Sequence, residues 1–255
     1  MVSWLNLLSG AGMIAVGAIA VYAWRRRAAA EFFLFGAVFW AAAIAVKVAM
    51  DLTMTGPFRD RLPPALAGAL LLGLYYGLRT GILESGIPYV VARAARLKPT
   101  FDQAVAVGIG FGAAEAILLG FGSLASVLAF ILSPDIISSY PQATRDALQM
   151  QLSLWFIPVP VWERLFTLVN HVFATVLALY AVRAGAGLAG KKWLALSMAI
   201  GVLVDGAIFW LAYFITSSSV AYIIVLEVLV AAVGLASIAG LFILRGQYDR
   251  HAPQA

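Results

Sequence analysis

Seven long apolar stretches alternate with short polar segments along the chain. A transmembrane helix needs about 20 mainly apolar residues, because each residue adds ~1.5 Å of rise across a ~30 Å hydrocarbon core. The pattern therefore predicts an all-α, polytopic membrane protein whose seven spans cover approximately residues 5–24, 30–50, 65–87, 101–124, 162–180, 191–216 and 220–244. We expect the fourth stretch to continue as apolar sequence as far as Leu132.

The segments between the spans differ in length and character. Residues 51–64 are predicted to form a polar turn, and Pro88 is predicted to end or kink the third span. Residues 133–160 are mixed and bounded by prolines, so we expect an outer loop with an amphipathic helix over 143–157 that lies above a cavity mouth. Residues 1–255 are interpreted as one transmembrane domain, with a core at 65–213 and peripheral first, second and seventh spans.

Composition supports this class and excludes others. Hydrophobic residues make up 63% of the chain and charged residues 11%, and the mean hydropathy is +0.96. A soluble globule could not cover so much apolar surface. The absence of cysteine excludes disulfides, thiolate metal sites and cysteine nucleophiles. The net charge of +5 is spread over loops and not gathered in one basic patch, so no nucleic-acid partner is expected.

The basic residues also predict an orientation in the membrane. Of the 17 lysines and arginines, three lie within or at the edges of spans, namely Lys47, Arg79 and Arg164. Three belong to loops on one side of the membrane, namely Arg59, Arg61 and Arg145, and the other eleven belong to the opposite side. Because lysine and arginine accumulate in cytoplasmic loops, we expect the N-terminus outside, the C-terminus in the cytoplasm, and residence in the cell membrane.

The fifth stretch carries the most unusual chemistry. It contains the adjacent pair Glu163–Arg164 and His171, the one histidine inside any apolar segment. Helical spacing places Arg164, Thr167 and His171 on the same face. Ionisable groups at membrane depth are costly, so they usually face the protein interior and mark functional sites.

Helix geometry predicts which of the buried polar residues meet. Glu115, His171 and Asp205 lie near one depth on three consecutive spans, so we expect them to converge on one cavity, with Glu84 below and Arg164 above. The small-residue face at Gly108 and Gly112 should let a neighbouring helix approach until Glu115 reaches His171 directly or through one water. Lys47 and Glu31, near the ends of the second span, are expected to reach the headgroups.

These residues resemble the ordered core motifs of the YhfC family. The resemblance rests on Gly81-Ile82-Leu83-Glu84, the glycine-rich run from Gly108 to Glu115, Glu163-Arg164 followed by His171, and Asp205, and it covers about residues 65–213. That family is assigned to intramembrane metalloproteases and is grouped with the type II CAAX proteases, PrsW and the scaffold subunit of gamma-secretase. The resemblance implies peptide-bond hydrolysis in or near the membrane, with a membrane peptide or a partner membrane protein as the ligand.

The resemblance also implies roles for single residues. Glu84, Glu115 and His171 would be catalytic, with a glutamate acting as general base for water. A divalent metal, zinc by resemblance, would be held by Glu115, His171 and Asp205. The supporting residues would be Glu163, Arg164, Asp205 and Arg79.

Four departures from the family pattern leave the function open. Ser85 replaces a second glutamate, Pro88 an arginine, and Phe111 and Gly201 each a histidine. Zinc sites usually take at least three ligands rich in histidine, and each change removes a polar or metal-binding group. Three classes therefore stay open: an active intramembrane protease, a catalytically inactive scaffold or substrate-binding subunit, and a proton- or cation-linked transporter. The polar residues also fit a structural role, as interhelical hydrogen-bond partners.

Overall fold

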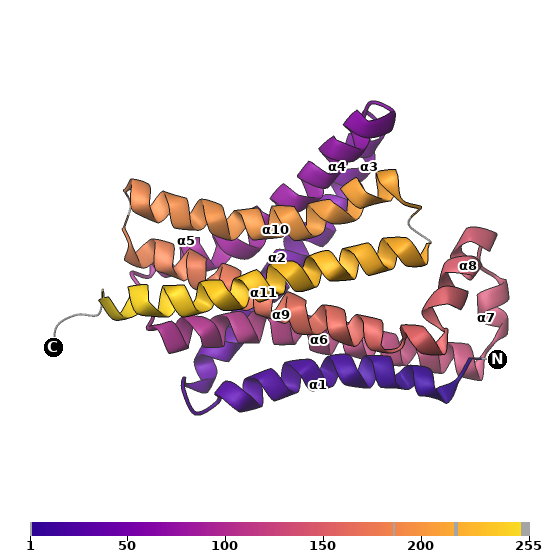
Figure 1. Ribbon diagram of the computed structural model, residues 1–255, viewed down its shortest axis with the longest axis horizontal. Coiled ribbons are helices and arrows are strands. Elements are labelled where there is room, and N and C mark those ends of the chain that lie inside the picture. The colour runs from indigo at the N-terminus through magenta and orange to yellow at the C-terminus, as the bar shows by residue number, and fades with distance from the viewer. Residues whose placement is uncertain (1, 186, 217–218, 251–255) are drawn as a thin grey trace.

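The computed structural model describes residues 2–185, 187–216 and 219–250, and its described part is helical, without a strand. Seven helical segments in this part are long and apolar enough to cross a membrane. They are Trp4–Trp24, Ala30–Arg59, Ala65–Ala94, Phe101–Leu132, Leu154–Arg183, Leu188–Phe214 and Val220–Tyr248. The predicted class of a polytopic, all-α membrane protein is thereby confirmed, and α1 begins at one end of the bundle whereas α11 finishes at the other (Figure 1).

The described helices divide into those that form most of each span and shorter segments that extend or connect the spans. The helices that form most of each span are α1 (Leu7–Trp24), α2 (Ala30–Met50), α4 (Ala65–Thr80), α5 (Gly86–Ala94), α6 (Phe101–Leu132), α9 (Pro158–Arg183), α10 (Leu188–Phe214) and α11 (Val220–Arg250). The short segments are η1 (Trp4–Asn6), η2 (Asp51–Thr55), α3 (Gly56–Arg59), η3 (Gly81–Ser85), α7 (Asp135–Ser138), α8 (Gln142–Gln151) and η4 (Leu154–Phe156).

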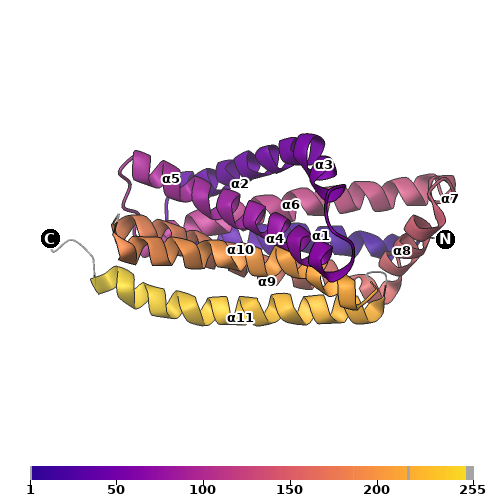
Figure 2. The same ribbon diagram turned by 90° about the horizontal axis from the view of Figure 1, so that it is seen from above.

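Helix α9 is the central element of the bundle. In its most apolar stretch 67% of the residues are buried, against 17–28% in the other six spans. It packs against α1, α5, α6, α10 and α11, whereas α1 and α2 pack on α6, and α4 packs on α10. Figure 2 shows α2 along one side of the bundle and α11 along the other. Most side chains of α9 are therefore in contact with neighbouring helices.

The second and third spans are longer than predicted. The segment 51–64, predicted as a turn, continues the second span as a helix to Arg59, and the third span passes Pro88 and ends at Ala94. A π-helical turn precedes each proline: η2 comes before Pro57 and η3 before Pro88. A proline inside a helix removes the bond to residue i−4 and its ring crowds that carbonyl, and a wider turn at that place lets the helix continue.

Glycines bring α6 and α9 unusually close together. A Cβ atom built on Gly108 would lie 2.5 Å from Cα of Val172, and one on Gly112 would lie 3.0 Å from Cα of Leu168. The third span meets α10 in the same way, since a Cβ on Gly81 would lie 2.3 Å from the carbonyl oxygen of Met198. Such small-residue faces let helix backbones touch in a membrane, where apolar side chains alone give no driving force for association.

The segment 133–160, predicted as an outer loop, contains α7, α8 and η4. Helix α8 ends at Gln151, earlier than the predicted limit of residue 157, because Ser153 adopts an extended conformation. The fifth span then begins at Leu154 and not at the predicted residue 162. Pro158 occupies the first turn of α9, a position where the missing N–H of proline costs no hydrogen bond.

Candidate functional site

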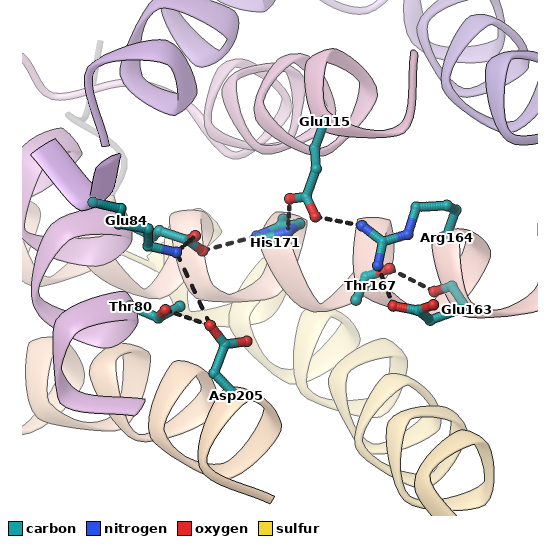
Figure 3. Close-up of polar contacts among 9 residues, drawn as sticks. Thr80, Glu84, Glu115, Glu163, Arg164, Thr167, His171 and Asp205 are labelled. Atoms are coloured by element: carbon teal, nitrogen blue, oxygen red, sulfur yellow. Dashed lines mark hydrogen bonds and ion pairs between the residues drawn. The ribbon is translucent and has the colours of Figure 1, made fainter. Parts of the chain in front are cut away.

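A cavity of about 240 Å³ lies in the interior of the bundle, beside α9. Its apolar walls come from α2, α6, α10 and α11, and the polar side chains gather on the inner faces of α9 and its neighbours. The charged lining residues are Lys47, Glu84, Glu115, Glu163, Arg164 and Asp205, joined by His171. Figure 3 shows Glu84, His171, Glu115 and Arg164 in one row, each in contact with the next.

His171 bridges two carboxylates from different spans. Its Nε2 lies 2.8 Å from Oε2 of Glu115 on α6, and its Nδ1 lies 3.4 Å from Oε2 of Glu84 in η3. A neutral imidazole carries one N–H and could donate at only one of these contacts. The ring of Phe111 covers the imidazole, with 4.9 Å between ring centroids. Both ring nitrogens are therefore already engaged.

Arg164 extends the row toward the N-terminal end of α9. Its guanidinium donates to Oε1 of Glu115 and to Oε1 of Glu163, and the residue is only 8% exposed. The backbone carbonyl of Glu163 in turn accepts a hydrogen bond from the hydroxyl of Thr167. Arg164 thus joins α9 to α6 inside the protein, because Arg164 and His171 lie about two turns apart on one face of α9 and both reach the same glutamate.

Lys47 is the site residue that the sequence prediction placed wrongly. It was expected at the headgroups, yet its side chain is only 11% exposed and its Nζ lies 2.5 Å from Oε1 of Glu84. The same ammonium lies 4.0 Å from Oδ2 of Asp205, which also accepts a hydrogen bond from Thr80. The reason is the length of the second span: it continues to Arg59, so Lys47 lies at interior depth. The sequence signal that could have placed Lys47 correctly is the continuation of the helix past Asp51, through residues 51–59.

Arg79, predicted to support the site, does not line the cavity. Its Nη1 lies 2.5 Å from Oδ1 of Asp51 in η2, and its guanidinium lies 4.6 Å from the ring centroid of Tyr76. Five residues separate Arg79 from Glu84, which places the two side chains about 140° apart around a helix. Lys47 fills the place beside Glu84 that Arg79 cannot reach.

The segment 133–160 does not cover this cavity. The lining contains no residue of 133–160, all of which the structure describes. Leu148 and Leu152 instead line a second cavity of about 290 Å³ with Asn6 and Ser9 of the first span and Val127 of α6. The predicted lid over the site is therefore wrong: α8 lies over the α1–α6 pair, to which the hydrogen bond from Asn6 to the carbonyl of Leu152 ties it.

The predicted metal ligands do not form one group. Within the described ranges, no three histidine, aspartate or glutamate side chains are placed to hold a metal ion. Glu115 and His171 are in contact, but Asp205 lies with Lys47 and Thr80 at the other end of the row. The carboxylates separate because each one faces a cation or donor of the protein itself.

Two cavity positions that the resemblance singled out, Phe111 and Gly201, offer no metal-binding side chain. Phe111 is buried against His171, in a place where a second imidazole would face the same cavity. Gly201 packs against the third span so tightly that a Cβ would lie 2.8 Å from the backbone nitrogen of Gly81. With one histidine whose nitrogens are both engaged, the residues present do not fit a zinc ion.

Comparison with known proteins assigns the family. The family model described as YhfC intramembrane metalloprotease matches residues 12–230. No curated protein and no solved structure matches the chain. The matched range contains the seven charged or ionisable residues that line the cavity, which are Lys47, Glu84, Glu115, Glu163, Arg164, His171 and Asp205. The chain therefore belongs to the YhfC family of intramembrane metalloproteases.

Proposed function

We propose that this protein is a binding subunit built on the YhfC fold, which holds a membrane-inserted peptide segment or a partner membrane protein in its cavity and has lost metal-dependent hydrolysis. One observation carries the proposal: Glu84, Glu115 and Glu163 are already paired with cations of the protein itself, Lys47 and Arg164. A carboxylate so paired is a weak metal ligand, since the metal would have to displace a resident cation.

The cavity keeps polar groups that an inserted segment could use. The side chains of Asp205 and Glu163 are each 36% exposed, at opposite ends of the row. Asn170 also lines the cavity, and its buried side-chain nitrogen has no hydrogen-bond partner among the described residues. An amide N–H can donate to a backbone carbonyl, which inside a membrane must otherwise stay without a partner. These groups favour a peptide over a purely apolar ligand.

Family membership supports a second candidate, hydrolysis assisted by a glutamate. In this version Glu84 or Glu115 accepts a proton from a water that attacks the peptide carbonyl, and His171 assists. Glu163, Arg164 and Asp205 would support the geometry. The ion pairs of Lys47 and Arg164 weigh against this candidate, because they already occupy carboxylate oxygens that would have to contact the attacking water.

The two candidates differ in what Glu115→Gln and His171→Ala would change. For the detergent-purified protein we expect no cleavage of a fluorogenic transmembrane peptide and no stoichiometric metal, and both variants should lower the melting midpoint. Glu31→Gln, on an exposed position at the start of α2, is the control and should match the wild type. Wild-type turnover that either variant abolishes with an unchanged melting midpoint would instead establish the hydrolase.

We also propose the orientation that the basic loops favour. The N-terminus would lie outside and the C-terminus in the cytoplasm of the cell membrane, with the outer segment 133–160 exposed on the outer face. The opposite placement of the start of α1 and the end of α11 in Figure 1 supports termini on different sides.

A further inference from the structure

Glu227 is a half-buried acid of α11 that forms no ion pair in the described chain. One of its carboxylate oxygens, Oε2, is shielded from solvent and has no hydrogen-bond partner among the described residues. Two residues beside it on the same helix, Leu226 and Val230, line the cavity. An acid without a partner inside a membrane span is costly, and by default it marks a functional site.

Helices α9 and α11 pack against each other and run in the same direction. A Cβ atom on Gly234 would lie 2.5 Å from Cδ1 of Phe166. One turn further along both helices, the hydroxyl of Ser237 donates to Oδ1 of Asn170 at 3.0 Å. Because the two contacts follow the same order on both chains, groups one turn nearer the N-terminal ends of the two helices also come close together.

This register brings Glu227 toward Glu163. Glu163 lies three residues before Phe166, and Glu227 lies seven residues before Gly234, so helical spacing puts each acid on the side of its helix that faces the other helix. Their levels along the bundle differ by about one turn. The charge of Glu227 is accordingly within electrostatic reach of Glu163 and of Arg164. The two acids share one positive group, and Arg164 already pairs with Glu115 as well.

Acids outnumber cations around the cavity. The acids are Glu84, Glu115, Glu163 and Asp205 in the lining and Glu227 beside it, and the described cationic lining groups are Lys47, Arg164 and, when protonated, His171. With every acid ionised, at least two negative charges have no resident cation. Building on the proposed binding function, we propose that the cavity takes a membrane-inserted peptide segment that carries a lysine or arginine, and that this basic side chain lies between Glu163 and Glu227.

Asn170 independently indicates a peptide and not a simple cation. It lines the cavity and is only 4% exposed, and its Nδ2 has no hydrogen-bond partner among the described residues. An amide N–H of this kind donates to a backbone carbonyl. Asn170 lies seven residues after Glu163, about 10 Å further along α9, a distance that roughly three extended residues cover. One inserted segment could therefore place a basic side chain at the acids and a carbonyl at Asn170.

The test measures the affinity of fluorescent leucine-rich transmembrane peptides for the protein in phosphatidylcholine nanodiscs. One peptide carries a single lysine near the end of its apolar stretch, and its partner carries methionine there. Wild type should bind the lysine peptide at least about tenfold more tightly. Glu227→Gln should remove most of this preference, leave the affinity for the methionine peptide unchanged, and unfold at the same or a higher temperature, because the carboxylate has no partner to lose. Glu31→Gln, at an exposed position, is the matched control.

A third peptide, with aspartate at the same place, needs only the wild type and should bind more weakly than the methionine peptide. Equal binding of the three peptides, or an unchanged preference in Glu227→Gln, would overturn the inference and leave the binding function standing. Binding of none of them would count against the binding function itself. A Glu227→Gln protein that unfolds at a lower temperature would show a structural role instead. Loss of the preference in phosphatidylethanolamine nanodiscs would assign the acids to a lipid amine and overturn the inference too.

Discussion

At the scale of single residues, the site is defined by how its charges are compensated. Arg164 forms ion pairs with Glu115 and Glu163. His171 contacts Glu115 and Glu84, and Lys47 pairs with Glu84 at the other end of the row. Unpaired, each of these groups would be very costly in a poorly hydrated interior, so removal of one partner costs more than the pair itself contributes. Removing any one charged group of the row should therefore lower the stability of the fold.

Arg164→Met should show this asymmetry. We expect a loss of about 3–5 kcal/mol, because Glu115 and Glu163 would both keep a buried or half-buried charge without the guanidinium. Chemical or thermal unfolding in detergent measures it. Arg93→Met is the matched control, since Arg93 is exposed and bonds only to the hydroxyl of Tyr89, so its change should stay within about 0.5 kcal/mol. Equal effects of the two variants would contradict this account.

At the scale of elements, the site depends on close approach between helices. Gly108 and Gly112 bring α6 to α9, and this approach is what places Glu115 2.8 Å from His171. The π-helical turn η3 matters as well, because Glu84 lies inside it, four residues before Pro88. Widened turns of this kind are frequent at functional sites, and here the turn lets the third span continue past the proline while carrying a buried acid.

Gly108→Ala should separate α6 from α9. The new Cβ would lie 2.5 Å from Cα of Val172, so the backbones must move apart, at a cost of about 1–3 kcal/mol. Gly122→Ala on the same helix is the control, because nothing lies within 4 Å of its Cβ, and alanine there should be neutral or stabilising by up to about 1 kcal/mol. Midpoints of thermal unfolding distinguish the two. If Gly108→Ala were as stable as Gly122→Ala, the close packing would not hold the site.

At the scale of the whole molecule, the other six spans of the described chain surround the mostly buried helix α9. Helix α9 contributes His171, Arg164 and Glu163, and the spans around it supply the remaining charged groups. The site therefore forms only when several spans pack together. An arrangement of this kind protects the cluster from lipid. It leaves the half-exposed Asp205 and Glu163 as the groups that a ligand would meet first.

The orientation predicts opposite fates for tags at the two ends. In intact cells a tag before the first span should be cleaved by external protease, and a tag after residue 255 should be protected until the membrane is permeabilised. A tag within 133–160 serves as an internal control for the outer face. Cleavage of both terminal tags in intact cells, or of neither, would contradict an odd number of crossings.

The sequence by itself determined the class of the molecule and most of its candidate site. Lengths of apolar runs specify seven spans, because bilayer thickness sets how many residues a helix needs. Helical spacing and depth were also enough to put Glu115 against His171 and to place Arg164 near both. These inferences succeed because they depend on local geometry and on one external constraint, the membrane.

Only the tertiary structure decided which charges pair and where the helices end. In the sequence the acid near Lys47 is Asp51 and the acid near Arg79 is Glu84. In the structure the pairs are exchanged: Lys47 pairs with Glu84, and Arg79 pairs with Asp51. The second and third spans continue through π-helical turns, which leaves Lys47 well inside its span. Contacts with the first span place α8 away from the cavity. Pairing between spans depends on the rotation of each helix about its axis. Contacts between helices set that rotation, and no single stretch of sequence contains it.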